Sequence, residues 1–395
     1  MNRKHGAVIV SAVRTPMGSF NGLFSPVPAT TLGSIAIAEA LRLVQLPVQR
    51  VDQVFMGCVL SAGLGQAPAR QASIGAGVPH SVGATTVNKV CGSSLMTVIM
   101  ASQAIMLGEA RILVAGGMEN MTRAPYLLEK ARQGYRLGHG ELVDSLVKDG
   151  LWDVYNNFHM GTAGELCASR YRLTRTEVDD FALESYRRAR EAIATGAFKR
   201  EIAPVEVPQR KGGVVTVTED EEPNRVDLRR MRELKPVFQE DGVLTVGNSP
   251  SCNDGAAALV VMDGEEATHL GLAPMAHIIG YAGAALAPEW FTIAPVEAIK
   301  LVLKKTGLSI EDIDLFEINE AFSAVSLAIN RELGLDSKKV NVHGGAVALG
   351  HPIGATGARI LTTLLHAMEL RGARRGLASL CIGGGEALAM VLERP

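Results

Sequence analysis

The sequence predicts a large protein of layered α/β architecture, and three observations lead to this class. A length of 395 residues exceeds one ordinary core, because a domain usually takes ~100–200 residues. Hydrophobic residues make up 47% of the chain and charged residues 20%, a balance that excludes a disordered protein. Short apolar runs of β type alternate with stretches of helical periodicity, as in folds whose sheets are buried between helices.

The first part of the chain predicts five elements in this alternating order. Apolar runs indicate strands at Ala7–Val13 and Gln53–Val59, and a helical pattern covers Thr31–Leu43 between them. Leu95–Leu107 carries apolar residues at helical spacing until a glycine stops it. Arg111–Ala115 then resumes a strand, which we expect to end before the two glycines that follow.

The same order returns after residue 273. The segment Ile313–Asn319 echoes Val51–Gly57, and each ends where a loop should begin. Self-similarity over more than a hundred residues favours a duplicated domain over a short-period solenoid. The other repeated elements are strands at Ala276–Tyr281 and Leu377–Ile382 and helices at Val296–Lys304 and Arg359–Leu370.

A segment with a different pattern of charged residues separates the two parts. It contains a charged helix at Glu177–Ala194, most of whose charges we expect to form a solvated face. The predicted division is a first half of residues 1–121 completed by 252–273, an inserted segment of 122–251, and a second half of 274–395.

Charge and cysteine content exclude several classes of function. A net charge of −2 gives no support for broad nucleic-acid or polybasic membrane binding. Apolar runs such as Ala256–Met262 are far shorter than the ~20 residues of a membrane helix. Five scattered cysteines without CxxC spacing indicate neither a disulfide framework nor a structural zinc site. We therefore expect a cytoplasmic protein with no nucleic-acid or membrane partner.

Cys91 is the first candidate for chemistry, since it lies between a β-type run and a predicted helix. A thiol at a helix N-terminus meets the positive end of the helix dipole and unpaired N–H groups, both of which favour thiolate. The small residues that follow it leave room for a substrate. The alternative is a buried structural cysteine.

His351 lies in a loop with five glycines in fourteen residues, 344–357, and is followed by a proline. Such a loop brings backbone N–H groups and an imidazole to one point, and histidine is the usual base for a thiol at neutral pH. The alternative is a solvent-exposed loop histidine without a catalytic role.

Two further segments end predicted strands with polar groups. Cys381 precedes three glycines whose exposed N–H groups suit an oxyanion hole, although a plain turn with an incidental cysteine is the alternative. Asn319 is suited to hold a water or a substrate carbonyl, or else to cap the following helix.

Four motifs occur together in one order: VNKVCGSS at 87–94, NEAF at 319–322, GGAVALGHPIGATGAR at 344–359 and CIGGG at 381–385. With them the chain resembles the thiolase family, the acetyl-CoA acetyltransferases and 3-ketoacyl-CoA thiolases, over essentially its whole length. The resemblance implies the thiolase fold, in which two duplicated mixed-sheet α/β halves stack in α-β-α-β-α layers with an inserted loop domain.

The resemblance also implies roles for five residues. Cys91 would be the acyl-accepting nucleophile, His351 its activating base and Cys381 an acid/base thiol. One oxyanion hole would combine His351 with a water held by Asn319, and the other the backbone N–H groups of Cys91 and Gly383. No metal or permanently bound cofactor is implied, because coenzyme A and acyl-CoA are substrates.

Coenzyme A contacts are implied on the inserted segment and nearby loops. Pro250 occupies the place of a pantetheine-binding serine, so Ser249 or Ser251 would substitute for it, and Phe291 stands where short-chain members commonly have methionine. The expected contacts are His159, Met160, Arg225, Phe238, Ser249 and Phe322.

The resulting expectation is an acetyl-CoA C-acetyltransferase that joins two acetyl-CoA through an acyl-Cys91 intermediate. The alternative within the family is a degradative thiolase for longer 3-ketoacyl-CoA. A cysteine hydrolase with a Cys91–His351 pair and a non-catalytic binding subunit are the alternatives of other classes. The resemblance further implies a homotetramer, a dimer of dimers, with contacts around 125–150.

Overall fold

The computed structural model describes residues 6–209 and 211–395. Ten strands form a mixed sheet in the order β14-β15-β16-β13-β1-β12-β5-β3-β4, with β2 paired to β12. Two residue pairs between β1 and β13, Val8 with His277 and Ile9 with Ala276, join the halves of this sheet. The strands are β1 (Ala7–Arg14), β2 (Gly18–Ser19), β3 (Gln53–Gly57), β4 (Gly83–Val87), β5 (Ile112–Asn120), β12 (Asn253–Asp263), β13 (Ala276–Ala285), β14 (Leu315–Ile318), β15 (Arg375–Ile382) and β16 (Glu386–Glu393).

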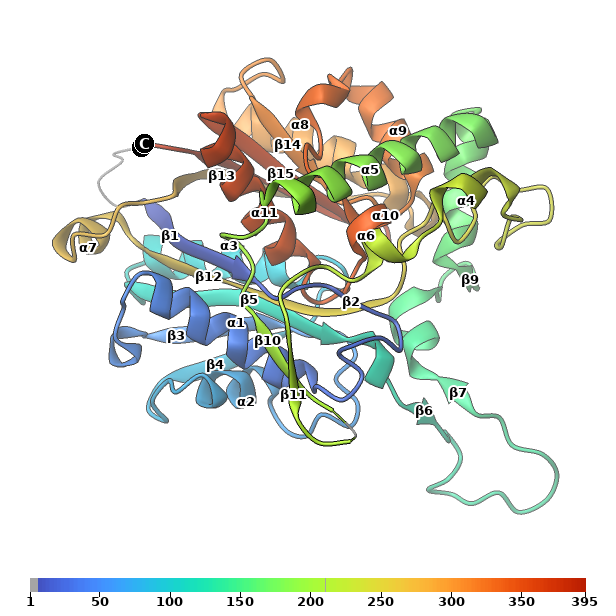
Figure 1. Ribbon diagram of the computed structural model, residues 1–395, viewed down its shortest axis with the longest axis horizontal. Helices are drawn as coiled ribbons and strands as arrows, with labels where there is room; N and C mark the ends of the chain where they lie inside the picture. The colour runs from blue at the N-terminus through green and yellow to red at the C-terminus, as the bar shows by residue number, and fades with distance from the viewer. Residues whose placement is uncertain (1–5, 210) are drawn as a thin grey trace.

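Helices cover both outer faces of the sheet and fill the space between its halves (Figure 1). One core packs α1 and α2 on the first half, and another packs α8 and α9 on the second. Between them, α3 and α11 share a core with both halves. The predicted α-β-α-β-α order is therefore confirmed. The helices of these layers are α1 (Ala29–Leu43), α2 (Pro68–Gly75), α3 (Ser93–Met106), α7 (Gly264–His269), α8 (Ala294–Thr306), α9 (Ser323–Leu333), α10 (Ala346–Leu349) and α11 (Thr356–Arg371).

The duplication extends to individual hydrogen bonds. β3 lies parallel to β5, and β14 lies parallel to β15 in the same way. Just before β3, the Asp52 carboxylate accepts the backbone N–H groups of residues 111–112 at 2.8 and 2.9 Å. Just before β14, the Asp314 carboxylate accepts those of residues 374–375, both at 2.9 Å. Asp52 and Asp314 are thus equivalent positions, which confirms the predicted echo between the two halves.

The segment between β5 and β12 adds small sheets and two longer helices. Its charged helix is confirmed as α5, which begins with a capping box between Thr174 and Glu177. A long loop between β6 and β7 projects from the body (Figure 1). The elements are β6 (Tyr126–Leu127), β7 (Val143–Asp144), β8 (Trp152–Asp153), β9 (Phe158–His159), α4 (Met160–Arg170), α5 (Arg175–Thr195), β10 (Val205–Pro208), β11 (Val214–Val217) and α6 (Glu222–Arg225).

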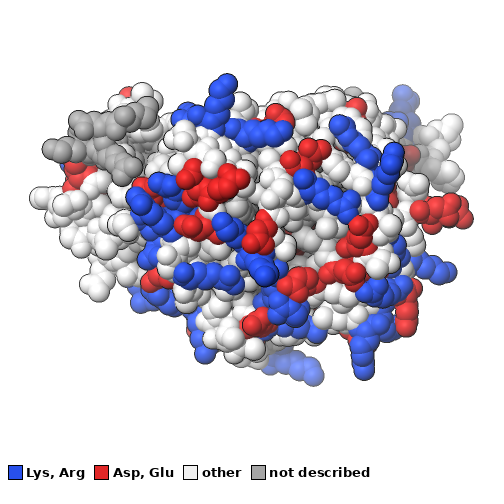
Figure 2. All heavy atoms as spheres, turned by 90° about the horizontal axis from the view of Figure 1, so that it is seen from above, with Lys and Arg blue, Asp and Glu red and all other residues white. Residues whose placement is uncertain are grey.

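Short helical segments complete the chain: η2 (Val48–Arg50), η3 (Met121–Arg123), η4 (Leu146–Leu151, of π type), η5 (Leu228–Glu233), η6 (Pro288–Ile293) and η7 (Ser337–Lys339). On the face that Figure 2 shows, cationic and anionic side chains are interspersed. None of the helices within 6–209 and 211–395 has both the length and the apolarity that a membrane crossing would need.

One expected boundary is wrong. β5 does not end before its two glycines but continues to Asn120, because β12 pairs with it along its whole length. Gly116 and Gly117 lie inside the strand, where a Cβ atom would collide with the backbone of β12 and of Gly354, respectively. The glycines therefore allow close approach of neighbouring backbone, and the longer strand brings Glu119 into the sheet.

Candidate active site

Cys91 lies on a tight turn directly before α3, as the sequence predicts. Val90 holds a φ of 45°, a conformation that is strained for a β-branched residue. The turn is stabilised by Ser93, whose hydroxyl donates to the Val90 carbonyl at 2.6 Å. Strain of this kind fixes the direction of the side chain that follows, here the Cys91 thiol.

The surroundings of the Cys91 sulfur include two backbone donors. The N–H groups of Cys91 and Gly383 hydrogen-bond to it and stabilise thiolate, but burial outweighs them and raises the pKa of the Cys91 thiol to about 11. The resting group is therefore the thiol. To act as a nucleophile it would need a base to take its proton, and the two N–H groups could stabilise an oxyanion formed at this point.

The loop that carries Gly383 lies against the Cys91 turn. Gly92 faces Ile382 so closely that a Cβ atom would collide with it, and Lys89 forms an ion pair with Glu386. Cys381, at the end of β15, is buried, and burial together with the nearby Cys91 raises the pKa of its thiol well above the usual range. The structure thus brings both predicted thiols together, each in its protonated form.

His351 is oriented by its own loop. Its Nδ1 lies 2.6 Å from the Thr356 hydroxyl, which donates its single proton to the Pro352 carbonyl at 2.9 Å. The hydroxyl must then accept from Nδ1–H, so Nε2 carries the free lone pair of a base. Burial, and secondly the charge of Arg359, lowers the pKa of His351 to about 3, which keeps the imidazole neutral at rest.

Two helix N-termini bring the Cys91 and His351 segments to the same end of the central layer. At the start of α11, the Ala358 N–H donates to the Ser94 hydroxyl at 3.0 Å. Gly357 packs against the Leu95 backbone so tightly that a Cβ atom would collide with it. The N-terminal ends of α3 and α11 are therefore in direct contact.

Asn319 follows β14 and is buried. Within the described chain, neither its side-chain oxygen nor its nitrogen has a hydrogen-bond partner. The capping interpretation is wrong, because α9 begins only at Ser323, with Phe322 at the N-cap position. A buried amide without a protein partner is suited to hold a water or a ligand carbonyl.

Four of the expected coenzyme A contacts form one cluster. His159 stacks on Phe238 at 5.1 Å between ring centroids, and Phe238 meets Phe322 edge to face at 5.8 Å. The Met160 sulfur would lie 3.4 Å from a Cβ atom at Gly383. Burial lowers the pKa of His159, so its imidazole is neutral. This aromatic wall therefore adjoins the candidate oxyanion hole.

The remaining residues expected to contact coenzyme A differ in whether they lie near the site. Ser249 is buried with a hydroxyl that has no partner in the described residues, whereas the Ser251 hydroxyl donates to Asn253 at 2.8 Å. Ser249 is thus the serine that is free to bind a ligand. Arg225 is exposed and pairs with Glu221 at 2.8 Å, and no described contact joins it to the aromatic wall. Phe291 is buried in the same core as Met160, Phe322 and Cys381.

Sequence reasoning missed one charged residue at this site. Glu119 is fully buried and accepts the backbone N–H of Gly354, three residues after His351, at 2.9 Å. The available signal was a single carboxylate in an otherwise uncharged strand segment, Ile112–Asn120.

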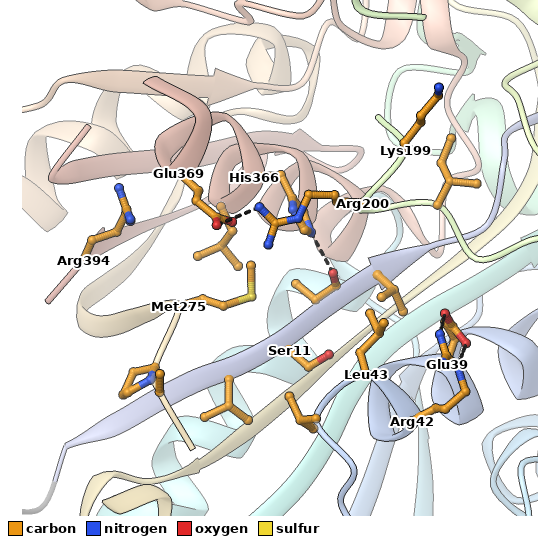
Figure 3. A pocket seen from close by; sticks show the side chains of 18 of the residues that line it. Ser11, Glu39, Arg42, Leu43, Lys199, Arg200, Met275, His366, Glu369 and Arg394 are labelled. Atoms are coloured by element: carbon orange, nitrogen blue, oxygen red, sulfur yellow. Dashed lines mark hydrogen bonds and ion pairs between the residues drawn. The ribbon is translucent and has the colours of Figure 1, made fainter. Parts of the chain in front are cut away.

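A pocket of about 680 Å³ lies elsewhere, along the open edge of β1 and the C-terminal ends of α1 and α11 (Figure 3). Arg200 pairs there with Glu369 and Arg42 with Glu39, while the His366 Nε2–H donates to the Ala12 carbonyl. None of the predicted site residues lines this pocket.

Among the residues that the structure describes, no group of three or more His, Cys, Asp or Glu side chains is arranged to hold a metal.

Comparisons with known proteins agree with this arrangement. The N-terminal domain model of thiolase matches residues 7–265, and the C-terminal domain model of thiolase matches residues 272–394. An acetyl-CoA acetyltransferase of Pseudomonas aeruginosa is 50% identical over 98% of this chain and 99% of its own length. Acetyl-CoA acetyltransferase 1 of Arabidopsis thaliana is 51% identical over 98% and 93%, and an acetyl-CoA acetyltransferase of Escherichia coli 51% over 98% and 98%. By its sequence, its duplicated layers and its matching domains, the chain belongs to the thiolase family.

Proposed function

We propose that the protein is an acetyl-CoA C-acetyltransferase, which reversibly converts two acetyl-CoA into acetoacetyl-CoA and coenzyme A. The observation that carries the proposal is the Cys91 thiol, which accepts the Gly383 N–H and lies beside the Cys381 thiol. The relatives of about 50% identity, which bear the name acetyl-CoA acetyltransferase, support the choice of substrate.

In the first half-reaction, His351 Nε2 takes the Cys91 proton as the sulfur attacks the thioester carbonyl of acetyl-CoA. The oxyanion accepts hydrogen bonds from the Cys91 and Gly383 N–H groups. The carbon–sulfur bond to coenzyme A then breaks, and the departing sulfur takes a proton from Cys381. Acetyl-Cys91, a Cys381 thiolate and protonated His351 remain.

In the second half-reaction, the Cys381 thiolate removes a proton from the methyl group of another acetyl-CoA. The enolate oxygen is stabilised by His351 Nε2–H and by a water that Asn319 holds. The enolate carbon attacks acetyl-Cys91, acetoacetyl-CoA departs, and His351 returns its proton to the Cys91 sulfur. All protons are then back in place.

The wall of His159, Met160, Phe238 and Phe322 is the proposed contact for the pantetheine arm, with Ser249 in place of the serine that Pro250 replaces. Its supporting observations are the ring stacking and the free buried hydroxyl described above. Arg225 is retained as a proposed contact for the adenine end, where its exposure leaves it accessible.

We further propose that the chain forms a homotetramer through the projecting segment between β6 and β8. In that segment, Leu137 and Leu142 are 100% and 62% exposed, a large apolar surface for a free monomer. Light scattering on the purified protein, with a variant in which both leucines are replaced by serine, tests this. A wild-type monomer would contradict the proposal.

Thiolysis of a series of 3-ketoacyl-CoA substrates from four carbons upward, with products identified by mass, tests the activity. Activity confined to four carbons is the expected result. Preference for longer chains would replace the proposal by a degradative thiolase, and release of free acid would favour a cysteine hydrolase. No reaction with any substrate would contradict the enzyme assignment.

A further inference from the structure

Glu119 is a buried carboxylate that the proposed reaction does not use. It lies on β5 with no exposed surface. Among the residues that the structure describes, no Lys or Arg lies within ion-pair distance of it, whereas the buried Arg14 and Arg359 each have a carboxylate partner. A buried carboxylate without a cationic partner is costly, so its position requires another explanation.

Hydrogen-bond donors from two separate loops converge on this carboxylate. Oε2 accepts the N–H of Val59 at 3.0 Å and that of Gly354 at 2.9 Å, and Oε1 accepts the N–H of Leu60 at 3.1 Å. The Cys58 thiol lies 3.8 Å from Oε1. Every one of these neighbours is a donor, an arrangement that satisfies an ionised carboxylate and gives the proton of a neutral acid no good acceptor.

The donor from Gly354 connects Glu119 to the histidine loop. Gly354 lies between His351 and Thr356, the residue whose hydroxyl orients the imidazole. It is packed so closely that a Cβ atom on it would lie 2.5 Å from the Glu119 carboxylate, and one on Gly57 would lie 2.6 Å from its carbonyl oxygen. The turn that places the histidine is therefore held to β5 through Glu119.

Glu119 is also linked to the site through its effect on the pKa of the Cys91 thiol. Burial is the main cause of the raised pKa of Cys91, and the negative charge of Glu119 adds to it in the same direction. Burial also raises the pKa of Glu119 itself to about 7. The titratable groups facing Cys91 are Glu119 from β5 and Cys381 from β15, with His351 as the proposed base. Cys58, at the end of β3, faces Glu119 from the other side.

We infer that Glu119 is a positioning residue: its carboxylate joins the His351 turn to the 58–60 loop and so fixes the orientation of the imidazole. The inference rests on the proposed role of Cys91.

The test compares Glu119→Gln with Asp52→Asn. Asp52 accepts two backbone N–H groups at the opposite end of β5, so its variant removes a similar clamp far from the thiol. Two quantities are measured: the pH dependence of Cys91 alkylation by iodoacetamide, and kcat and KM for acetoacetyl-CoA thiolysis. Acetyl-Cys91 formation in the wild type is checked first, since its absence would overturn the role of Cys91 rather than that of Glu119.

For Glu119→Gln we expect the alkylation curve to move to lower pH and kcat to fall roughly tenfold or more, with little change in KM. Asp52→Asn should match the wild type in both measurements. A Glu119→Gln enzyme that matches the wild type in both would overturn the inference.

Glu119→Asp covers the case in which the glutamine variant does not fold. It keeps the charge but shortens the reach, so alkylation should follow the wild-type curve while kcat falls. A wild-type kcat in this variant would overturn the inference too, because the clamp would then be unnecessary.

Discussion

At the carboxyl ends of their parallel strands, the two halves of the sheet carry different side chains at equivalent positions. Asp52 and Asp314 define the equivalence, since each accepts the two corresponding N–H groups of the neighbouring strand. Five residues further on, the first half has Gly57 and the second has Asn319. Gly57 is packed against the Gly354 carbonyl with no room for a side chain, whereas Asn319 has a buried amide with no protein partner.

The strands next to these, β5 and β15, also differ in that only the second half carries a reactive side chain at the equivalent position. Met118 of β5 corresponds to Cys381 of β15, and each belongs to the outer core of its own half. The methionine only packs, while the cysteine lies beside Cys91. The first half thus contributes the proposed nucleophile and a close-packed support, and the second contributes the proposed proton-handling groups. The duplication thus produced two similar strand ends, of which one packs closely and the other carries the side chains of the proposed reaction.

The largest expected loss of activity follows from removing the proposed nucleophile of the first half. Cys91→Ala should lower condensation and thiolysis by at least ~10³-fold, because the acyl acceptor is gone and no thiol of the second half occupies its position. Incubation with acetyl-CoA followed by peptide mass spectrometry should find no acetylated cysteine. Covalent acetylation at Cys381 in this variant would show that the halves exchange roles.

Cys381→Ser tests the second half alone. The serine should slow acetylation of Cys91 only modestly, because coenzyme A can leave as a thiolate without a proton donor. It should lower condensation by ~10²–10⁴-fold, because a hydroxyl is a poor base for the methyl proton. Rapid-quench measurement separates the two steps. Equal loss of both half-reactions would contradict the division of labour between the halves.

Two buried asparagines of the second half differ in their hydrogen bonds. The side chain of Asn341 has protein partners, whereas that of Asn319 has none among the described residues. Asn341 accepts the Ile318 N–H and donates to the Ile318 carbonyl, both at 2.8 Å. Asn319→Ala should lower kcat by ~10²–10³-fold and change the free energy of unfolding by less than ~1 kcal/mol. Asn341→Ala should instead destabilise the protein by ~2–4 kcal/mol. Denaturant titration with assays distinguishes them, and a strongly destabilised Asn319→Ala would assign that residue a structural role.

Phe291→Met has the smallest expected effect. The residue belongs to the same core of the second half as Met160, and methionine is narrower and more flexible than phenylalanine. The ratio of thiolysis rates for six-carbon and four-carbon substrates should rise about fivefold, which corresponds to ~1 kcal/mol. An unchanged ratio would mean that this side chain does not contact the acyl chain.

Local features made much of the site predictable. A thiol before a helix, a histidine among glycines and a cysteine before three glycines are all visible within a few residues, so Cys91, His351 and Cys381 could be selected. The layered fold followed from alternating patterns for the same reason. Glu119 could not be found in this way, because its donors come from residues 58–60 and 354, which only the folded chain brings to β5. Nor could the central position of β12, which depends on long-range pairing.

That position of β12 has a consequence for synthesis. The strand lies between β1 and β5, yet residue 263 leaves the ribosome long after residue 120. At ~5–20 residues per second, the interval is roughly 7–30 s, during which β1 and β5 lack their common partner. Unpaired apolar strand edges are sites of aggregation. The nascent chain therefore needs protection during this interval, and slower production at low temperature or additional chaperones should raise the yield of folded protein.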